Sequence, residues 1–221
     1  MKNDNSSGVV RSPGILRHLI EFIKYYPDIL DGNICDQIVS ELQEIDLNND
    51  LVADSTRKNG DKDGMSFLYS ININDKEHSS FFPYLVDAIT KGKNRYLEEQ
   101  PKYSRLYKFA SGETYGIYED IGNKLLIQYY PTGVNMSTHI DTGVRNYMKN
   151  NLKIDTEHCH SQLSCLLYLN DDYEGGEFVV ADQEYKTTKG SIIFFPSSFM
   201  FPHMVNKVTK GERWSCAGWL R

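Results

Sequence analysis

The feature that most constrains the fold is a series of short apolar segments between residues 124 and 221. Each segment is bounded by glycine, proline, asparagine or aspartate, the residues that most often form turns. The segments read KLLIQYY, SQLSCLLYLN, GEFVVA, SIIFFP, HMVNKV and ERWSCAGWL. Many short strands at this spacing are typical of an antiparallel sandwich or barrel. We therefore expect strands to form the core of the C-terminal half.

The N-terminal half favours helices. Residues 32–45, GNICDQIVSELQEI, repeat their apolar side chains on one helical face, and Asn33 could cap this helix. Residues 82–100 predict a second helix, which begins at its proline and is weakened by Gly92. Residues 14–30 also follow a helical stripe, although a strand is an alternative there.

Length and composition suit one globular domain, since the chain has 221 residues and 40% of them are hydrophobic. We expect helices within about residues 12–120 to buttress a strand core of about residues 124–221, in a single domain spanning 1–221. The net charge of −6, from 24 basic and 30 acidic residues, argues against binding nucleic acid or membranes through charge alone. A basic run is predicted to be a solvated face; it comprises Lys91, Lys93, Arg95, Lys102, Arg105 and Lys108.

The cysteines and the termini bear on the cellular compartment. Cys35, Cys159, Cys165 and Cys216 show no close CxxC pairing. The chain shows no bilayer-length apolar stretch and no signal peptide pattern. We therefore expect a cytoplasmic protein with free thiols and no membrane contact. The sequence does not indicate an oligomeric state.

A candidate metal set lies in the strand region. In the segment THID, His139 and Asp141 are two positions apart, so in a strand they would point to the same face. A later histidine, His203, follows an apolar strand and a proline turn in FPHMVN. Two histidines and one carboxylate form the ligand set of non-haem Fe(II) oxygenases, which leaves three metal positions open. Because short motifs also arise by chance, other features must support this interpretation.

The last strand offers a candidate carboxylate-binding group. Alternation along GERWSCAGWL places Arg213 and Ser215 on one face, together with Ala217 and Trp219. Arginine binds carboxylates through two parallel hydrogen bonds, so this face could hold one end of a dicarboxylic acid. The alternatives are an ion pair with a local carboxylate such as Asp171, or an arginine that reaches solvent.

The strand SQLSCLLYLN points to the same kind of pocket. Tyr168 shares a face with Ser164 and Leu166, and a buried phenol needs a hydrogen-bond partner. A bound carboxylate would provide that partner. A core tyrosine satisfied by the backbone is the alternative.

Three blocks of sequence carry a family resemblance. They are YYPTGVNMSTHID, LLYLNDDYEGGEFVV and GSIIFFPSSFMFPHMVNKVTKGERWSCAGWL. In order and spacing they resemble the signature blocks of the Fe(II)/2-oxoglutarate-dependent dioxygenases, and the prolyl 4-hydroxylase branch is the most similar. The resemblance covers roughly residues 124–221. It implies an α+β fold in which N-terminal helices buttress a double-stranded β-helix, or jelly-roll, barrel.

The resemblance also assigns roles to individual residues. His139, Asp141 and His203 would be the iron ligands. Arg213 stands where the family binds the distal carboxylate of 2-oxoglutarate, and Ser215 completes an Arg-x-Ser pattern. Tyr168 matches a tyrosine of the family that often binds the same carboxylate. Tyr130 matches a tyrosine that lines the cosubstrate pocket, and the adjacent Tyr129 is the alternative for this position. Gly175 and Gly176 would be structural turn residues.

The activity that the resemblance implies is hydroxylation of an unactivated C–H bond, with Fe(II), 2-oxoglutarate, O2 and, as a reductant, ascorbate. The expected substrate is a prolyl residue in a peptide or protein. Arg213 replaces the lysine usual in collagen-type enzymes, and Met136 replaces a common aromatic residue, which leaves the substrate side of the pocket open. The carboxylate of Asp141 favours hydroxylation over halogenation.

Three alternatives remain at this point. The enzyme could act on a small molecule or a free amino acid instead of a peptide. A non-catalytic jelly-roll binding module would keep the fold without the activity. Finally, EHCH, with His158, Cys159 and His160 near Cys165, offers zinc-type ligands.

Overall fold

The computed structural model describes residues 19–44, 69–72, 80–99, 125–141 and 162–220. Two helices are present, α2 at Gly32–Gln43 and α3 at Phe82–Glu99. The strands before residue 162 are β1 (Lys24–Tyr26), β2 (Tyr69–Asn72), β3 (Leu126–Tyr130) and β4 (Met136–His139). The later strands are β5 (Leu163–Tyr168), β6 (Glu174–Gly175), β7 (Phe178–Val180), β8 (Gln183–Tyr185), β9 (Ile192–Pro196), β10 (His203–Val205), β11 (Val208–Lys210) and β12 (Arg213–Leu220).

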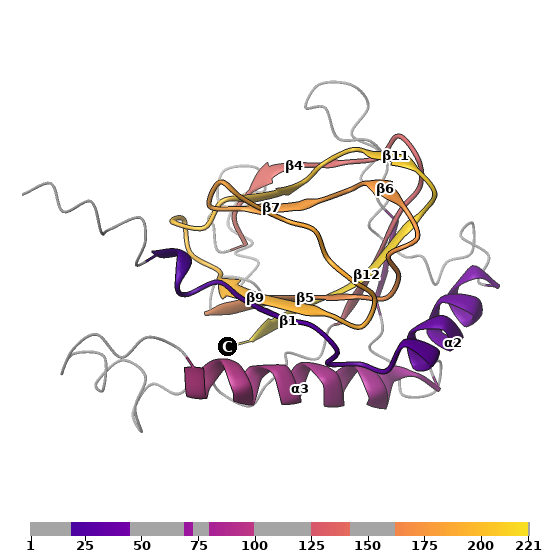
Figure 1. The fold of residues 1–221 in the computed structure, drawn as a ribbon, viewed down its shortest axis with the longest axis horizontal. Helices are drawn as coiled ribbons and strands as arrows, with labels where there is room; N and C mark the ends of the chain where they lie inside the picture. Colours follow the sequence, from indigo (N-terminus) through magenta and orange to yellow (C-terminus); the bar gives the residue numbers. More distant parts are fainter. Residues whose placement is uncertain (1–18, 45–68, 73–79, 100–124, 142–161, 221) are drawn as a thin grey trace, which may run out of the picture.

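The strands form antiparallel sheets, as the sequence predicts. A six-stranded sheet has the order β1-β9-β5-β12-β3-β2, a four-stranded sheet has the order β4-β10-β7-β8, and β11 pairs with β6. The two larger sheets face each other, and α3 runs along the outer side of the six-stranded sheet (Figure 1). Among the described residues, the sheets form a sandwich of separate sheets and do not close into one barrel.

The two faces of the six-stranded sheet bury different clusters. On β12, Ala217 belongs to the cluster between the sheets, whereas Trp214 and Cys216 belong to the cluster on the helix side. On β5, Leu166 lies between the sheets and Leu167 lies on the helix side. The predicted alternation of both strands is therefore confirmed, and the faces that carry Arg213 and Tyr168 are turned to the interior of the sandwich.

The N-terminal predictions are partly confirmed. Helix α2 forms as expected, but its cap is Asp31, whose carboxylate accepts a 2.8 Å hydrogen bond from the Asn33 N–H. Asp31 has extended backbone angles, which a cap requires, while Asn33 is already inside the helix. A helix throughout residues 14–30 is wrong for its described part. There the strand alternative holds for β1, which pairs with β9, because tertiary pairing overrides a short helical pattern.

The basic run is not uniformly solvated. Lys91 and Arg95 are exposed, but Lys93 is only 6% exposed. Lys93 lies on the buried stripe of α3, together with Ile89, Gly92 and Tyr96. An aliphatic lysine stem can pack there while its ammonium group reaches the surface. Lys102, Arg105 and Lys108 lie outside the described residues.

The structure bears on two predictions, the free thiols and the absence of a bilayer-length apolar segment, for the described residues. Cys35, Cys165 and Cys216 are buried free thiols, and Cys159 lies outside the described residues. Of the described helices, neither combines the length and the hydropathy needed to cross a bilayer.

Gly92 permits the close packing of α3 on the six-stranded sheet. A Cβ atom at position 92 would lie 2.6 Å from Cε2 of Phe194 on β9. The Phe194 ring is itself packed against the rings of Tyr26 and Tyr96, at centroid distances of 6.3 and 5.8 Å. The ring therefore has little room to move. The glycine that lowers the helix propensity of this segment is required by its packing.

We predict that Gly92→Val lowers the free energy of unfolding by about 2–3 kcal/mol, because the added methyl groups overpack a fixed aromatic cluster. Lys91→Val is the matched control, since the same side chain enters the same helix at an exposed position. Chemical denaturation measures both variants. Equal losses in the two variants would contradict the packing role of Gly92.

Candidate active site

Strand register brings the two histidines of the predicted metal set together. His203 on β10 is the direct antiparallel partner of His139 on β4. Their imidazole ring centroids are 4.2 Å apart. The rings of Phe178 and Phe195 pack against His203, at centroid distances of 5.7 and 4.7 Å. The imidazole of His203 is therefore held in one position by aromatic contacts.

Hydrogen bonds fix the orientation of both imidazoles. Nδ1 of His139 lies 2.9 Å from the carbonyl oxygen of Ser137, and Nδ1 of His203 lies 3.2 Å from that of Phe201. A carbonyl only accepts, so Nδ1 carries the proton in both rings. Nε2 is then the ring atom that can ligate a metal once it carries no proton, which is the usual arrangement of metal-binding histidines.

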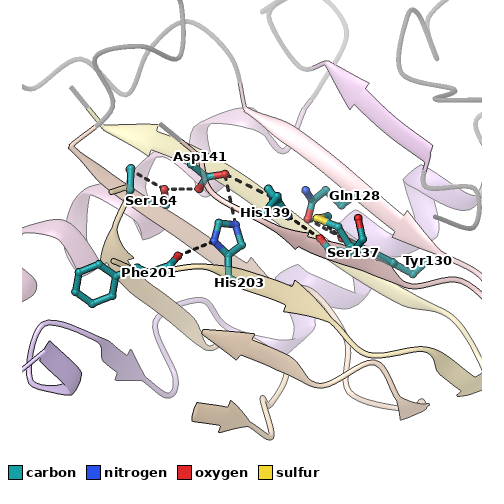
Figure 2. Close-up of polar contacts among 10 residues, drawn as sticks. Gln128, Tyr130, Ser137, His139, Asp141, Ser164, Phe201 and His203 are labelled. Carbon is teal, nitrogen blue, oxygen red and sulfur yellow. Dashed lines mark hydrogen bonds and ion pairs between the residues drawn. The ribbon is translucent and has the colours of Figure 1, made fainter. Parts of the chain in front are cut away.

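The carboxylate of Asp141 uses its two oxygens differently (Figure 2). Oδ1 lies 3.7 Å from Nε2 of His139 and 3.4 Å from Nε2 of His203. Oδ2 accepts a 2.5 Å hydrogen bond from the Ser164 hydroxyl. Asp141 lies beyond the end of β4, so the simple expectation that it continues the strand with His139 is wrong. The turn after His139 brings the carboxylate back to the two imidazoles.

Burial by itself would raise the pKa of Asp141. When Nε2 of His203 carries a proton, its hydrogen bond and charge, with the bond from Ser164 and the charge of His139, outweigh this effect and hold the pKa of the carboxyl below its usual value. The group is therefore an anion at neutral pH, the form that a metal requires.

The three side chains meet the geometric requirement for a shared ion. One ligand atom from each of His139, Asp141 and His203 lies within 4.8 Å of the others. It is the single cluster of this kind in the part of the chain that the structure describes. The set provides two neutral nitrogens and one oxygen anion on one side of the ion, which fits Fe(II) and leaves positions for other ligands. His158, Cys159 and His160, the rival zinc ligands, lie outside the described residues.

Arg213 is completely buried in the same interior. It pairs with Tyr130 across β12 and β3, and its guanidinium carbon lies 4.7 Å from the Tyr130 ring centroid and 5.1 Å from that of Tyr168. Nη1 donates to the Ser215 hydroxyl at 3.1 Å. No carboxylate lies within ion-pair distance of the guanidinium among the described residues, and Asp171 instead accepts from the backbone N–H of Lys189.

Three buried polar atoms around Arg213 lack partners within the described structure. They are Nε and Nη2 of Arg213 and the hydroxyl oxygen of Tyr168. Burial raises the pKa of Tyr168, so its hydroxyl remains a donor. Buried donors without partners are costly, and a buried guanidinium without an anion is more so. An anionic ligand with carboxylate geometry would satisfy all three atoms.

Gly176 helps to form the cradle of Arg213. Its φ of +67° suits glycine, and a Cβ atom there would lie 3.1 Å from Cδ of Arg213. At Gly175, with φ +73°, a Cβ atom would lie 2.2 Å from the carbonyl oxygen of Lys207. The close contacts and positive φ angles support the predicted structural role of both glycines, although Gly175 ends β6 and only Gly176 lies outside a strand. Gly176 also borders the guanidinium.

The two candidate tyrosines of β3 face opposite ways. Tyr130 is fully buried beside Arg213, and its hydroxyl lies 3.9 Å from Sδ of Met136. Tyr129 stacks on Trp214 at 4.3 Å, and its hydroxyl donates to Glu212 at 2.8 Å. Tyr130, and not Tyr129, therefore shares the interior with Arg213.

Two polar residues of the interior, Gln128 and Ser197, were not predicted from the sequence. Gln128 accepts hydrogen bonds from the hydroxyls of Tyr130 at 3.4 Å and Ser215 at 3.5 Å. Ser197 lies 2.7 Å from the Ser164 hydroxyl. The glutamine in KLLIQYY could have been noticed, because it shares a face with Tyr130 in an otherwise apolar strand. Ser197 directly follows the end of β9, and no periodic pattern marked it.

Sequence comparison connects this site to a family. Residues 125–221 match the 2OG-Fe(II) oxygenase superfamily. A PKHD-type hydroxylase from Janthinobacterium sp. (strain Marseille) is 39% identical over 102 residues, which cover 43% of this chain and 42% of that protein. Human prolyl 3-hydroxylase 2 is 46% identical over 64 residues, which cover 26% of this chain and 9% of that protein. The chain thus spans less than half the length of either relative.

Structural comparison agrees at the level of the fold. The prolyl hydroxylase from Trichoplax adhaerens, solved in complex with a hypoxia inducible factor oxygen degradation domain peptide fragment, has a TM-score of 0.61. The similarity covers 93% of this chain and 86% of that one, at 14% sequence identity. Fe(II) and 2-oxoglutarate, which give the superfamily its name, fit the His–Asp–His set and the arginine that has no acidic partner in the described part of the chain. Residues 125–221 of this chain are thus similar to the 2OG-Fe(II) oxygenase superfamily, and the relatives that match there include PKHD-type and prolyl hydroxylases.

Proposed function

We propose that this protein is an Fe(II)- and 2-oxoglutarate-dependent dioxygenase that hydroxylates an unactivated C–H bond of a prolyl residue in a peptide or protein. One observation carries the proposal: a fully buried arginine, which has no acidic partner among the described residues, lies in the same interior as a two-histidine, one-carboxylate cluster. A metal cluster alone would fit several metals, and an arginine alone could bind any anion. Their combination fits a metal-dependent enzyme with a carboxylate cosubstrate.

The proposed metal ligands are Nε2 of His139, Oδ1 of Asp141 and Nε2 of His203. The backbone hydrogen bonds at both Nδ1 atoms fix the correct tautomers in advance. His203 and Asp141 are largely buried, whereas His139 is 19% exposed, so the ion would be approached from the His139 side. This arrangement keeps one flank of the metal covered by protein.

The proposed cosubstrate pocket is centred on Arg213. Its Nε and Nη2 would bind the distal carboxylate of 2-oxoglutarate, and the Tyr168 hydroxyl would donate to the same group. Ser215 holds Nη1, and Gln128 in turn accepts from Ser215, so the guanidinium is oriented before the ligand arrives. Tyr130 covers the guanidinium face and would line the pocket.

When bound, the iron would activate O2, the oxidant, and 2-oxoglutarate would supply two electrons and become succinate and CO2 as the C–H bond is hydroxylated. The protein provides position and environment. Its apolar side chains between the sheets exclude water from the reacting centre, among them Phe178, Phe195 and Val205. Arg213 sets the distance of the cosubstrate from the metal ligands, and ascorbate is the proposed external reductant.

The prolyl substrate is supported by relatives and not by a pocket in this chain. Human prolyl 3-hydroxylase 2 is similar in sequence over a short stretch, and the Trichoplax prolyl hydroxylase, whose fold is similar, was solved with a peptide. We also propose that the two sheets form a jelly-roll core and that residues 1–221 act as one domain, because the helix-side cluster joins α2, α3 and the six-stranded sheet.

The first prediction concerns the assembled site. Under anaerobic conditions, Fe(II) and 2-oxoglutarate added to the purified protein should give the visible charge-transfer band of the chelate. His139→Ala should abolish the band because it removes a ligand. Absence of the band in folded wild-type protein would refute the oxygenase proposal and favour the non-catalytic binding module. If the band forms, the rate of succinate formation is then compared with proline peptides and with free amino acids as candidate substrates.

The second prediction separates ligand binding from stability. Arg213→Met removes a buried charge that has no anionic partner among the described residues. Without ligand, the free energy of unfolding of the variant should therefore equal that of the wild type or exceed it by up to about 3 kcal/mol. With Mn(II) and 2-oxoglutarate at 100 times its Kd, wild-type protein should gain about 2.7 kcal/mol. The variant should lose this gain at the same concentration.

Arg95→Met is the matched control, because Arg95 is exposed and paired with Glu99 on the surface of α3. It should change the ligand-free stability by less than about 0.5 kcal/mol and keep the full gain from 2-oxoglutarate. A large destabilisation of ligand-free Arg213→Met would show that Arg213 is structural. A retained gain from 2-oxoglutarate would show that Arg213 does not bind it.

A further inference from the structure

A pair of buried serines reaches the candidate metal centre from the opposite sheet. Ser164 belongs to β5 of the six-stranded sheet, and Ser197 directly follows β9, its neighbour in that sheet. The backbone N–H of Ser197 donates to the carbonyl of Gln162 at 3.1 Å, which continues the pairing of β5 with β9. The two serines are 2% and 1% exposed. Strand pairing therefore fixes both side chains.

The direction of the hydrogen bonds follows from the chemistry of the groups. A metal-binding carboxylate is ionised, so Oδ2 of Asp141 only accepts, and Ser164 must donate to it. A hydroxyl has one hydrogen. The 2.7 Å contact between the serines is therefore a bond in which Ser197 donates to Ser164. The hydrogen-bond chain runs from Ser197 to Ser164 and from Ser164 to Asp141, and each bond polarises the next. Figure 2 shows the bond between Ser164 and Asp141.

We propose that Ser164 and Ser197 are positioning residues that hold Asp141 as a one-oxygen ligand of the metal, an inference that rests on the proposed function. Oδ1 is the oxygen directed at both histidines, at 3.7 and 3.4 Å from their Nε2 atoms. Oδ2 accepts the hydrogen bond from Ser164, which opposes a rotation of the carboxylate that would bring this oxygen to the ion. A carboxylate held in this way keeps three metal positions open for cosubstrate and oxygen.

The alternative is that the serines only fill polar space between the sheets. The geometry argues against a space-filling role, because Ser164 donates its single hydroxyl hydrogen to Oδ2 of Asp141, whereas Oδ1 is the oxygen near both histidines. Outer hydrogen bonds of this type typically contribute 10- to 100-fold to metal affinity. A space-filling role would leave metal affinity unchanged.

The test is a titration of the full chain with Mn(II), followed through the electron paramagnetic resonance signal of the free ion. Ser164→Ala should weaken Mn(II) binding about 10- to 100-fold. Ser197→Ala should weaken it at least about threefold but less than Ser164→Ala, since it acts through Ser164. The double variant should have the same Mn(II) affinity as Ser164→Ala, because Ser197 acts on Asp141 only through the hydroxyl that Ser164→Ala removes. Thermal unfolding checks that each variant is folded.

Ser191→Ala is the matched control, since Ser191 is also a buried serine but bonds to the carbonyl of Thr188. It should bind Mn(II) as the wild type does. Wild-type affinity within about twofold in folded Ser164→Ala or Ser197→Ala would overturn the positioning role, and so would losses that multiply in the double variant. If the wild type itself binds no Mn(II), the metal site and this inference fail together, whereas the former outcomes leave the metal site intact.

Discussion

The uncompensated positive charge of Arg213 is the constraint on which the site depends. A guanidinium with no exposed surface, two unpaired nitrogens and no carboxylate within reach among the described residues is an expensive feature of a ligand-free interior. The rings of Tyr130 and Tyr168 offset part of this cost through cation–π contacts. The remaining cost favours binding of an anion, and a metal held by His139, Asp141 and His203 would give the proposed anion a second point of attachment.

Antiparallel pairing explains how residues far apart in the sequence meet. The register of β10 with β4 places His203 opposite His139, and the register of β12 with β3 places Arg213 opposite Tyr130. The proposed metal ligands thus belong to the four-stranded sheet and the segment just after β4. The proposed carboxylate-binding residues, Arg213 and Tyr168, belong to the six-stranded sheet. The bond from Ser164 to Asp141 joins the two sheets at the metal side, and the contact of Tyr130 with Met136 joins them beside the arginine.

Local pattern was sufficient for the parts of this arrangement that repeat. Two-residue alternation gave the inward faces of β5 and β12, and with them the placement of Arg213, Ser215 and Tyr168. It failed where the chain leaves a regular element or pairs at long range. Asp141 lies past the end of β4, Ser197 lies just past the end of β9, and β1 forms because it pairs with β9. No periodicity encodes these features, since they depend on residues distant in the sequence.

The most direct test of the account is the affinity for 2-oxoglutarate with and without Mn(II), measured by calorimetry beside succinate. Succinate has the dicarboxylate ends for Arg213 but lacks the keto acid that a metal binds. We expect Mn(II) to strengthen 2-oxoglutarate binding at least about tenfold, a coupling near 1.4 kcal/mol, and to leave succinate binding nearly unchanged. Equal affinities for 2-oxoglutarate with and without the metal would contradict a shared site for the ion and the cosubstrate.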